Sequence, residues 1–280
     1  YATALVKVLA ERGAPLTWHL RRQEDAHALR ANGCHPRYLQ HVHLPLSEVR
    51  LTTDVASAVQ DAEAVFLLSP SAYVEGLLHP LPKGALAGKA VISGIKGLVP
   101  GTGQRISHLL QTEHGVPHEK FVVLGGPGHA EEIATGQQTY LTAAAQDAAL
   151  AEAVSTWLQG PSLSTQPSDE VAAIEYAGAL KNIYALALGL AQGLGYGDNF
   201  RAVLVTAALR EQAAWLGKQN GQPVDIISSV YLGDLLTTAY SPHSRNQTLG
   251  RLVGQGHTVA QAQDEMQMVA EGYYASRLLT

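Results

Sequence analysis

The sequence predicts an α/β protein in two parts, a doubly wound nucleotide-binding sheet followed by an all-helical domain. Short apolar runs alternate with helical patterns through the first half, as expected for a parallel sheet with crossover helices. From about Ser168 onward one helical pattern follows another, with no convincing strand. A chain of 280 residues is long enough for two domains, which we place at residues 1–168 and 169–280.

The predicted strands are apolar runs that end in polar or turn-forming residues. We expect strands at Pro15–Leu20, Ala64–Ser69, Lys89–Ile95, Phe121–Gly125 and Thr139–Ala144. Helical patterns separate most of them, and we expect helices at Tyr1–Arg12, Asp54–Asp61, Tyr73–Leu78 and Thr102–His114. A doubly wound domain should open with a strand and a G-x-G-x-x-G loop, whereas this sequence begins within a helix. We therefore expect an incomplete chain, unless the nucleotide-binding interpretation is wrong.

Composition and charge exclude several classes of protein. With 46% hydrophobic and 15% charged residues, the chain is typical of a soluble globular protein. No segment resembles a transmembrane span or a signal peptide, and the net charge of -5 argues against a nucleic-acid-binding protein. Cys34 is the only cysteine, which excludes an internal disulfide and favours the cytoplasm. No H-E-x-x-H motif or Cys/His cluster occurs, so we predict no metal site.

The ends of the predicted strands carry residues suited to a ligand, because ligands of open α/β sheets bind beyond the carboxyl ends of the strands. Arg21 and Arg22 follow the first predicted strand. Arginine at this point accommodates the 2′-phosphate of NADP, whereas an acidic residue would favour NAD. Two solvated arginines beside Glu24 and Asp25 are the alternative. Later strand ends carry Ser69-Pro70-Ser71, Lys96-Gly97 and Gly126-Pro127-Gly128-His129-Ala130.

A lysine interrupts an apolar helix in the second half. The pattern Glu175–Leu190 is apolar on nearly every side, yet it contains Lys181 with Gly178 and Ala185 on the same face. Burying an unpaired ammonium costs several kcal/mol, so Lys181 either extends past the helix to water or has a buried function. The helix alone leaves both interpretations open. With a buried function, the small neighbours would leave room for a substrate.

A second candidate ligand site follows Gly233-Asp234-Leu235 along the chain. Ser244 is a suitable N-cap for a helix that begins at Arg245, which would place free backbone N–H groups beside a guanidinium and the amide of Asn246. Such a helix start suits a phosphate or a carboxylate. An ordinary capped helix with an exposed arginine is the alternative.

Together these segments resemble the NAD(P)-dependent glycerol-3-phosphate dehydrogenases of the soluble bacterial type. The matching motifs occur in the family's order, roughly at its spacing, across the whole chain. They are Ile95-Lys96-Gly97-Leu98, Gly126-Pro127 with Ala130-Glu131-Glu132, Gly178-Ala179-Leu180-Lys181-Asn182, Gly233-Asp234-Leu235, Ser244-Arg245-Asn246 and Val269-Ala270-Glu271-Gly272. The resemblance implies a Rossmann-like domain followed by a helical domain of the 6-phosphogluconate dehydrogenase type.

The resemblance also implies an activity. The family interconverts dihydroxyacetone phosphate and sn-glycerol 3-phosphate with NADH or NADPH, as a cytoplasmic homodimer that supplies glycerol phosphate for phospholipid synthesis. Two alternatives are another two-domain reductase of 2-keto or 3-hydroxy acids that uses NADP, and a non-catalytic dinucleotide-binding sensor. The first would not need Lys96 together with Ser244-Arg245-Asn246 for a phosphate, and the second would not need Lys181 with Asp234.

Site residues follow from the resemblance by position. Lys181 matches the catalytic lysine, which protonates the new alkoxide during reduction and accepts the proton in reverse. The implied substrate-binding residues are Lys96, Gly126, Gly128, Lys181, Asp234, Ser244, Arg245 and Asn246. The implied cofactor-binding residues are Tyr1, Arg21, Arg22, Tyr38, Pro70, Lys96, Ala130, Arg245, Val269 and Glu271.

The implied site departs from the family at Gly128 and requires an unusual pKa of Lys181. Gly128 stands where the family usually has Ser or Thr, so a backbone N–H at Gly128 would have to replace one hydrogen bond to the substrate. A free lysine has a pKa near ~10.4 and is a poor base at neutral pH. We expect burial and Lys96 to lower the pKa of Lys181, with Asp234 opposing them. The sequence also ends before the family's last helices, as a trimmed chain would.

Overall fold

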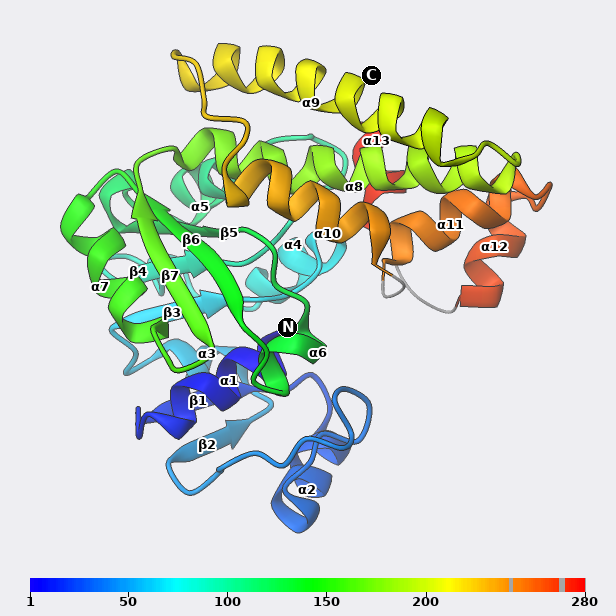
Figure 1. The fold of residues 1–280 in the computed structure, drawn as a ribbon. Coiled ribbons are helices and arrows are strands. Elements are labelled where there is room, and N and C mark those ends of the chain that lie inside the picture. The colour runs from blue at the N-terminus through cyan, green and yellow to red at the C-terminus, as the bar shows by residue number, and fades with distance from the viewer. Residues whose placement is uncertain (242–243, 267–269, 280) are drawn as a thin grey trace.

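The main sheet contains five strands in the part of the chain that the structure describes, in the order β3-β4-β5-β6-β7 (Figure 1). The structure is a computed structural model and describes residues 1–241, 244–266 and 270–279. The strands are β3 (Ala64–Leu67), β4 (Ala90–Ser93), β5 (Phe121–Gly125), β6 (Thr139–Ala145) and β7 (Leu163–Ser168). Their buried residues are mostly Val, Ile, Leu and Ala, so both faces of the sheet are covered.

The sheet is mixed rather than fully parallel. β3, β4 and β5 run parallel, whereas β6 is antiparallel to β5 and parallel to β7. The helix between β5 and β6 is the five-residue α6 (Ala130–Ala134). A helix this short does not carry the chain back along the sheet, and an antiparallel neighbour needs no such return.

A smaller parallel sheet pairs β1 (Leu16–His19) with β2 (Val49–Thr52). α1 (Ala2–Glu11) lies between the two sheets (Figure 1). Leu5 and Leu9 of α1 pack in the core of the main sheet, while Ala4 packs in the core around the small sheet. α1 therefore joins the two sheets through one amphipathic helix.

The remaining helices of the first half cover the sheets and connect their strands. They are α2 (Gln23–Asn32), α3 (Val55–Val59), α4 (Val74–Leu78), α5 (Ile106–His114) and α7 (Ala148–Leu158), with short 3-10 turns η1 (Ser71–Tyr73) and η2 (His118–Lys120). Every element described after β7 is helical, and these helices gather on one side of the main sheet (Figure 1). They are α8 (Val171–Gly193), α9 (Asp198–Asn220), the π-helical turn η3 (Ser229–Gly233), α10 (Asp234–Tyr240), α11 (Arg245–Gly254), α12 (Val259–Met266) and α13 (Glu271–Ser276).

The predicted fold class is confirmed, with differences in individual elements. The five expected strands are present, although the first, second and third are shorter than predicted, and β2 and β7 were not expected. The helix expected from Thr102 begins only at Ile106. Gly101 and Gly103 have positive φ angles of 78° and 68°, which belong to a turn and not to a helix. Within the described residues, we find no helix long and apolar enough to cross a membrane.

α8 and α11 pack backbone against backbone at glycines. A Cβ added to Gly250 of α11 would lie 2.0 Å from the carbonyl oxygen of Leu186, and one added to Gly189 of α8 would lie 2.1 Å from that of Gln247. Real Cβ atoms do not approach backbone so closely. Glycine at these two positions is therefore the condition for this packing.

Replacing Gly250 with alanine should lower the free energy of unfolding by about 3 kcal/mol, because the rigid backbones of α8 and α11 must separate. Urea unfolding followed by circular dichroism measures the change. Gly217→Ala on α9 is the matched control, since its Cβ would lie 3.7 Å from the nearest atom, the carbonyl oxygen of Gln222. There the higher helix propensity of alanine should leave stability unchanged or raised by up to about 1 kcal/mol. An equally harmless Gly250→Ala would contradict the close packing.

Candidate active site

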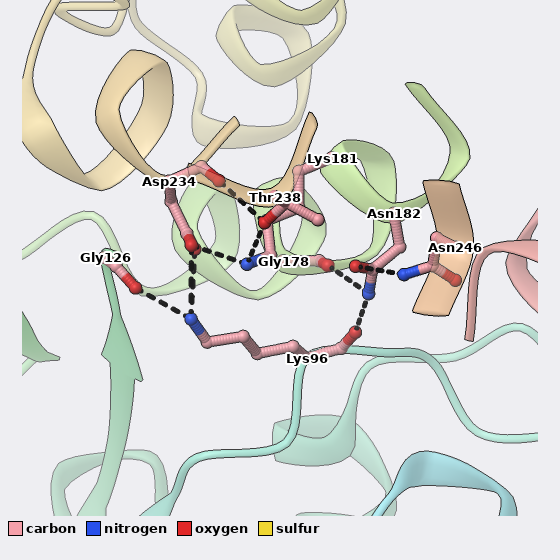
Figure 2. Close-up of polar contacts among 8 residues, drawn as sticks. All are labelled: Lys96, Gly126, Gly178, Lys181, Asn182, Asp234, Thr238 and Asn246. Carbon is pink, nitrogen blue, oxygen red and sulfur yellow. Dashed lines mark hydrogen bonds and ion pairs between the residues drawn. The ribbon is translucent and has the colours of Figure 1, made fainter. Parts of the chain in front are cut away.

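The candidate active site lies where the carboxyl ends of β4 and β5 face the helical half of the chain. Lys96 follows β4, Gly126 follows β5, Lys181 is in the middle of α8, and Asp234 is the first residue of α10. Figure 2 shows the side chains of Lys96 and Lys181 both pointing at the Asp234 carboxylate, Lys96 from below and Lys181 from the side. Parallel strands bring their carboxyl ends to one edge, which explains how residues far apart in sequence meet here.

Lys181 is buried and paired. Its side chain is 7% exposed, and its ammonium donates hydrogen bonds to Asp234 Oδ1 at 2.5 Å and to Thr238 Oγ1 at 2.9 Å. Burial lowers the pKa of Lys181 to about 7, since the opposing effect of Asp234 is only partial and Lys96 adds to the lowering. The expectation of a depressed pKa is confirmed. The alternative, in which Lys181 extends to bulk water, is wrong.

Asp234 lies between two ammonium groups. Lys96 Nζ donates to Asp234 Oδ2 at 3.1 Å and Oδ1 at 3.3 Å, and to the carbonyl oxygen of Gly126 at 2.7 Å. Burial alone would raise the pKa of Asp234, but Lys181 and Lys96 outweigh it and the net shift is downward. Asp234 therefore stays ionised, and one negative charge faces two cations. The pocket suits an anionic substrate and a developing alkoxide.

A chain of buried amides fixes the backbone of Lys96. Asn182 Nδ2 donates to the carbonyl oxygens of Lys96 at 2.9 Å and Gly178 at 3.1 Å, and Asn182 Oδ1 accepts from Asn246 Nδ2 at 2.8 Å (Figure 2). Asn246 Oδ1 in turn accepts from the N–H of Gly272 at 2.8 Å. The protein thus engages both ends of the Asn246 amide, so a substrate would have to share this side chain with Asn182 and Gly272.

Two polar residues at the site were missed as site residues. Thr238 is one helical turn after Asp234 and binds Lys181, and Asn182 adjoins Lys181 in sequence and binds Lys96. Spacing offered a signal in both cases, because residues four apart share a helix face and adjacent residues can serve different partners. Neither spacing specified which partner each side chain would meet.

Three predicted glycine positions have packing roles. A Cβ on Gly178 would lie 3.3 Å from Lys96 Cα, so the space beside Gly178 holds the Lys96 backbone, and the interpretation of Gly178 as clearance for a substrate is wrong. Gly126 has a φ of 100°, which glycine adopts readily. A Cβ on Gly128 would lie 2.9 Å from Leu141 Cδ2, so a serine there would require Leu141 to move.

The predicted helix start at residue 244 is confirmed. Ser244 caps α11 by accepting a hydrogen bond from the N–H of Gln247 at 3.3 Å. Arg245 is the first residue of the helix and is exposed. The helix start and the Arg245 guanidinium form a cationic edge of the kind that binds phosphate.

Two residues predicted to bind the cofactor, Glu271 and Tyr1, contact segments that follow strands of the main sheet. Glu271 of α13 accepts from the N–H and the hydroxyl of Ser71, at 2.8 Å and 2.5 Å, and so contacts the loop that contains Pro70. Tyr1 lies against Gly94 at the end of β4, since a Cβ on Gly94 would be 2.8 Å from Tyr1 Cε1. Val269 is outside the described residues.

Other predicted cofactor positions belong to the end of β1, the start of α6 and the loop between α2 and β2. Arg21 and Arg22 follow β1 and are exposed, and the Arg21 guanidinium lies 5.9 Å from the centre of the Tyr73 ring. Ala130 begins α6. Tyr38 is 56% exposed, with its ring 4.9 Å from that of His35. Two exposed arginines fit a negatively charged dinucleotide, whose chemistry is hydride transfer.

The fold and the site together define a two-part dinucleotide-dependent dehydrogenase, in which a buried lysine of the helical part faces the edge of a doubly wound sheet. Comparison with known proteins specifies it further. Two protein-family models match: the N-terminus of NAD-dependent glycerol-3-phosphate dehydrogenase at residues 1–151 and its C-terminus at residues 170–280. The chain belongs to the NAD-dependent glycerol-3-phosphate dehydrogenase family.

Individual relatives agree with this assignment. A glycerol-3-phosphate dehydrogenase (NAD(P)+) of Azotobacter vinelandii is 34% identical over 279 residues, covering 100% of this chain and 81% of the relative. One from Staphylococcus aureus strain JH9 is 32% identical over 280 residues, covering 99% and 83%. The crystal structure of glycerol-3-phosphate dehydrogenase from Coxiella burnetii superposes with a TM-score of 0.88 at 27% identity, covering 99% of this chain and 84% of that one.

Proposed function

We propose that this chain interconverts dihydroxyacetone phosphate and sn-glycerol 3-phosphate, with Lys181 as the group that transfers the proton. The observation that supports this most strongly is the buried Lys181–Asp234–Lys96 cluster at the carboxyl edge of the sheet. NADH or NADPH supplies the hydride when bound. A dehydrogenase with a phosphate-bearing substrate uses both lysines. The alternative reductase would not need Lys96 for a phosphate, and a non-catalytic sensor would need neither lysine.

Lys181 performs the proton transfer because of its surroundings. Arrival of a hydride at the ketone carbon creates an alkoxide, which needs a proton donor within hydrogen-bond reach. Lys181 carries that proton, Thr238 and Asp234 orient its ammonium, and Lys96 adds a second positive charge beside the developing alkoxide. Ser244 and Arg245 are proposed to hold the phosphate, with Asn246, Gly126 and the backbone of Gly128 completing the substrate site.

The pH dependence of kcat/KM should follow the ionisation of Lys181, whose pKa is lowered to about 7. Reduction uses the ammonium form, so its kcat/KM should be constant below about pH 7 and fall by about tenfold per pH unit above it. Oxidation uses the neutral amine, so its kcat/KM should rise with pH up to about 7 and be constant above it. His129 does not account for this limb, since burial lowers its pKa below the ordinary 6.5. Initial rates measured in both directions between roughly pH 5.5 and pH 9.5 would test the sign of this pH dependence.

The direct test is an assay of the reaction with both nucleotides. We expect dihydroxyacetone phosphate to consume NADH or NADPH, measured by absorbance at about 340 nm, and the unphosphorylated ketone to be a far poorer substrate. Arg21 and Arg22 support a preference for NADPH, which the ratio of the two kcat/KM values measures. Absence of turnover with either nucleotide, in a protein shown to be folded, would contradict the proposed function.

Further properties are proposed from the family. We propose that residues 1–168 bind the nucleotide and residues 169–280 complete the substrate site. We also propose a cytoplasmic homodimer that supplies glycerol phosphate for phospholipid synthesis. Size-exclusion chromatography with light scattering tests the dimer.

A further inference from the structure

One face of α8 holds both ends of the segment that carries Lys96. Glu175, Gly178 and Asn182 are spaced three and four residues apart, so they lie on the same side of the helix. The segment from Lys96 to Ser107 runs from the end of β4 to the first turn of α5. Its two ends meet α8 at different points of this face, so α8 serves as a template for the position of the segment.

The near end of the segment is fixed by packing and an amide. The Lys96 backbone lies against Gly178, and its carbonyl oxygen accepts a hydrogen bond from Asn182. Leu98 is also buried, against Ala179 of the same helix. These contacts restrict where the Lys96 backbone can lie.

The far end of the segment is fixed by a buried carboxylate. Glu175 is 4% exposed and accepts from the N–H of Ser107 at 2.9 Å, from the Ser107 hydroxyl at 2.5 Å and from Arg105 Nη1 at 3.2 Å. Arg105 is the N-cap residue of α5 and makes no side-chain cap of its own. Glu175 therefore caps α5 from another helix, which suits a carboxylate near a helix start.

We propose that Glu175 is a positioning residue for the pair Lys96 and Lys181. By holding the start of α5 on α8, Glu175 fixes the segment that begins at Lys96, and so fixes the distance between the ammonium groups of Lys96 and Lys181. This inference rests on the proposed function, in which the two lysines act together. It assigns no contact between Glu175 and the substrate. Lys181 lies on the same helix, six residues after Glu175, so any change in how the loop sits on α8 alters Lys96 relative to Lys181.

Displacement of Lys96 would change the pKa of Lys181 in a definite direction. Lys181 faces Asp234 of α10, Lys96 of the loop after β4 and His129 of the loop after β5. If the loop relaxes and Lys96 moves away, its repulsion weakens and the pKa of Lys181 rises. Loss of the Glu175 negative charge by itself would lower that pKa. An upward shift therefore reports displacement of Lys96 and not the missing charge.

The test compares Glu175→Gln with Asp25→Asn, both of which neutralise a buried carboxylate that pairs with an arginine. Glu175→Gln should lower kcat for reduction about 10- to 100-fold, as a displacement of about 1 Å in a catalytic group does, and should move the limb near pH 7 upward. Asp25→Asn should leave kcat and the limb unchanged. Ser107→Ala, which removes one hydrogen bond to Glu175, should shift the limb in the same direction by less, and provides the test if Glu175→Gln does not fold.

Titration of Lys181 by NMR of protein labelled with ¹³C-lysine tests the same shift without turnover. A raised pKa of Lys181 in Glu175→Gln or Ser107→Ala supports the proposal even if the enzyme's substrate has been assigned wrongly. Unchanged or lowered pKa values, or activity lost only in proportion to the unfolded fraction, would overturn it. Inactive wild-type protein with the expected shift would instead reject the proposed function alone.

Discussion

Lys181→Met is expected to lower kcat for the reduction of dihydroxyacetone phosphate by about 10³- to 10⁴-fold, near the upper range for a general acid, while the protein stays folded. Methionine keeps the apolar stem within α8 and removes only the ammonium. Asp234 retains a partner, because Lys96 Nζ lies 3.1 Å from its Oδ2. The carboxylate is therefore not left buried without a cation, the situation that makes such substitutions strongly destabilising.

Steady-state rates at saturating nucleotide measure this loss, and circular dichroism with thermal unfolding confirms the fold. Lys218→Met is the control, since Lys218 is an exposed lysine in the last turn of α9 and should show normal turnover. The residual activity of Lys181→Met should also lose the limb near pH 7. Turnover within tenfold of the wild type would remove Lys181 from the role of proton donor.

Patterns local to the sequence predicted much of the sheet. β5 was predicted with its bounds, since Phe121–Gly125 is a continuous apolar run that ends in glycine. β7 was missed because its pattern is broken by Pro167, which lacks an N–H to donate. Proline is tolerated there because β7 is at the edge of the sheet, a fact that only the order of the strands reveals. β2 was missed because it is short and is recognised as a strand only from its pairing with β1.

The site, like the sheet, could be predicted only in part from the sequence. The resemblance carried by several motifs implied that Lys181, Lys96 and Asp234 belong to one site, and the hydrogen bonds of both lysines to the Asp234 carboxylate agree with it. The role of Gly178 did not follow, because its neighbour is the backbone of a residue more than eighty positions earlier in the sequence. Glu175 was unpredictable for the same reason, since its partners are 68 and 70 positions away. Long-range backbone contacts leave no periodic trace in a single sequence.

Asp234→Asn is expected to reduce kcat for reduction about 10²-fold near pH 7.5, as the loss of preorganised charge at a site does. The amide keeps the shape of the side chain and removes the negative charge between Lys181 and Lys96. Since Asp234 raises the pKa of Lys181, its neutralisation should lower that pKa further below about 7. Lys181 would then be mostly neutral at pH 7.5 and unable to donate a proton, so the limb for reduction should move to lower pH.

Stability should change with the activity, because two ammonium groups lose the carboxylate that compensates them. The free energy of unfolding should fall by about 3–5 kcal/mol at pH 6, where Lys181 of the folded wild type is mostly charged and paired with Asp234, and by less at pH 9, where it is mostly neutral. The sign follows from linkage, since a lysine whose folded pKa is depressed favours the folded state as pH rises through that value. Asp198→Asn, at a carboxylate that is 95% exposed beside Arg201, is the control and should change neither property. A limb that moved upward in Asp234→Asn would contradict the assignment, because it would mean that Asp234 does not stabilise the Lys181 ammonium.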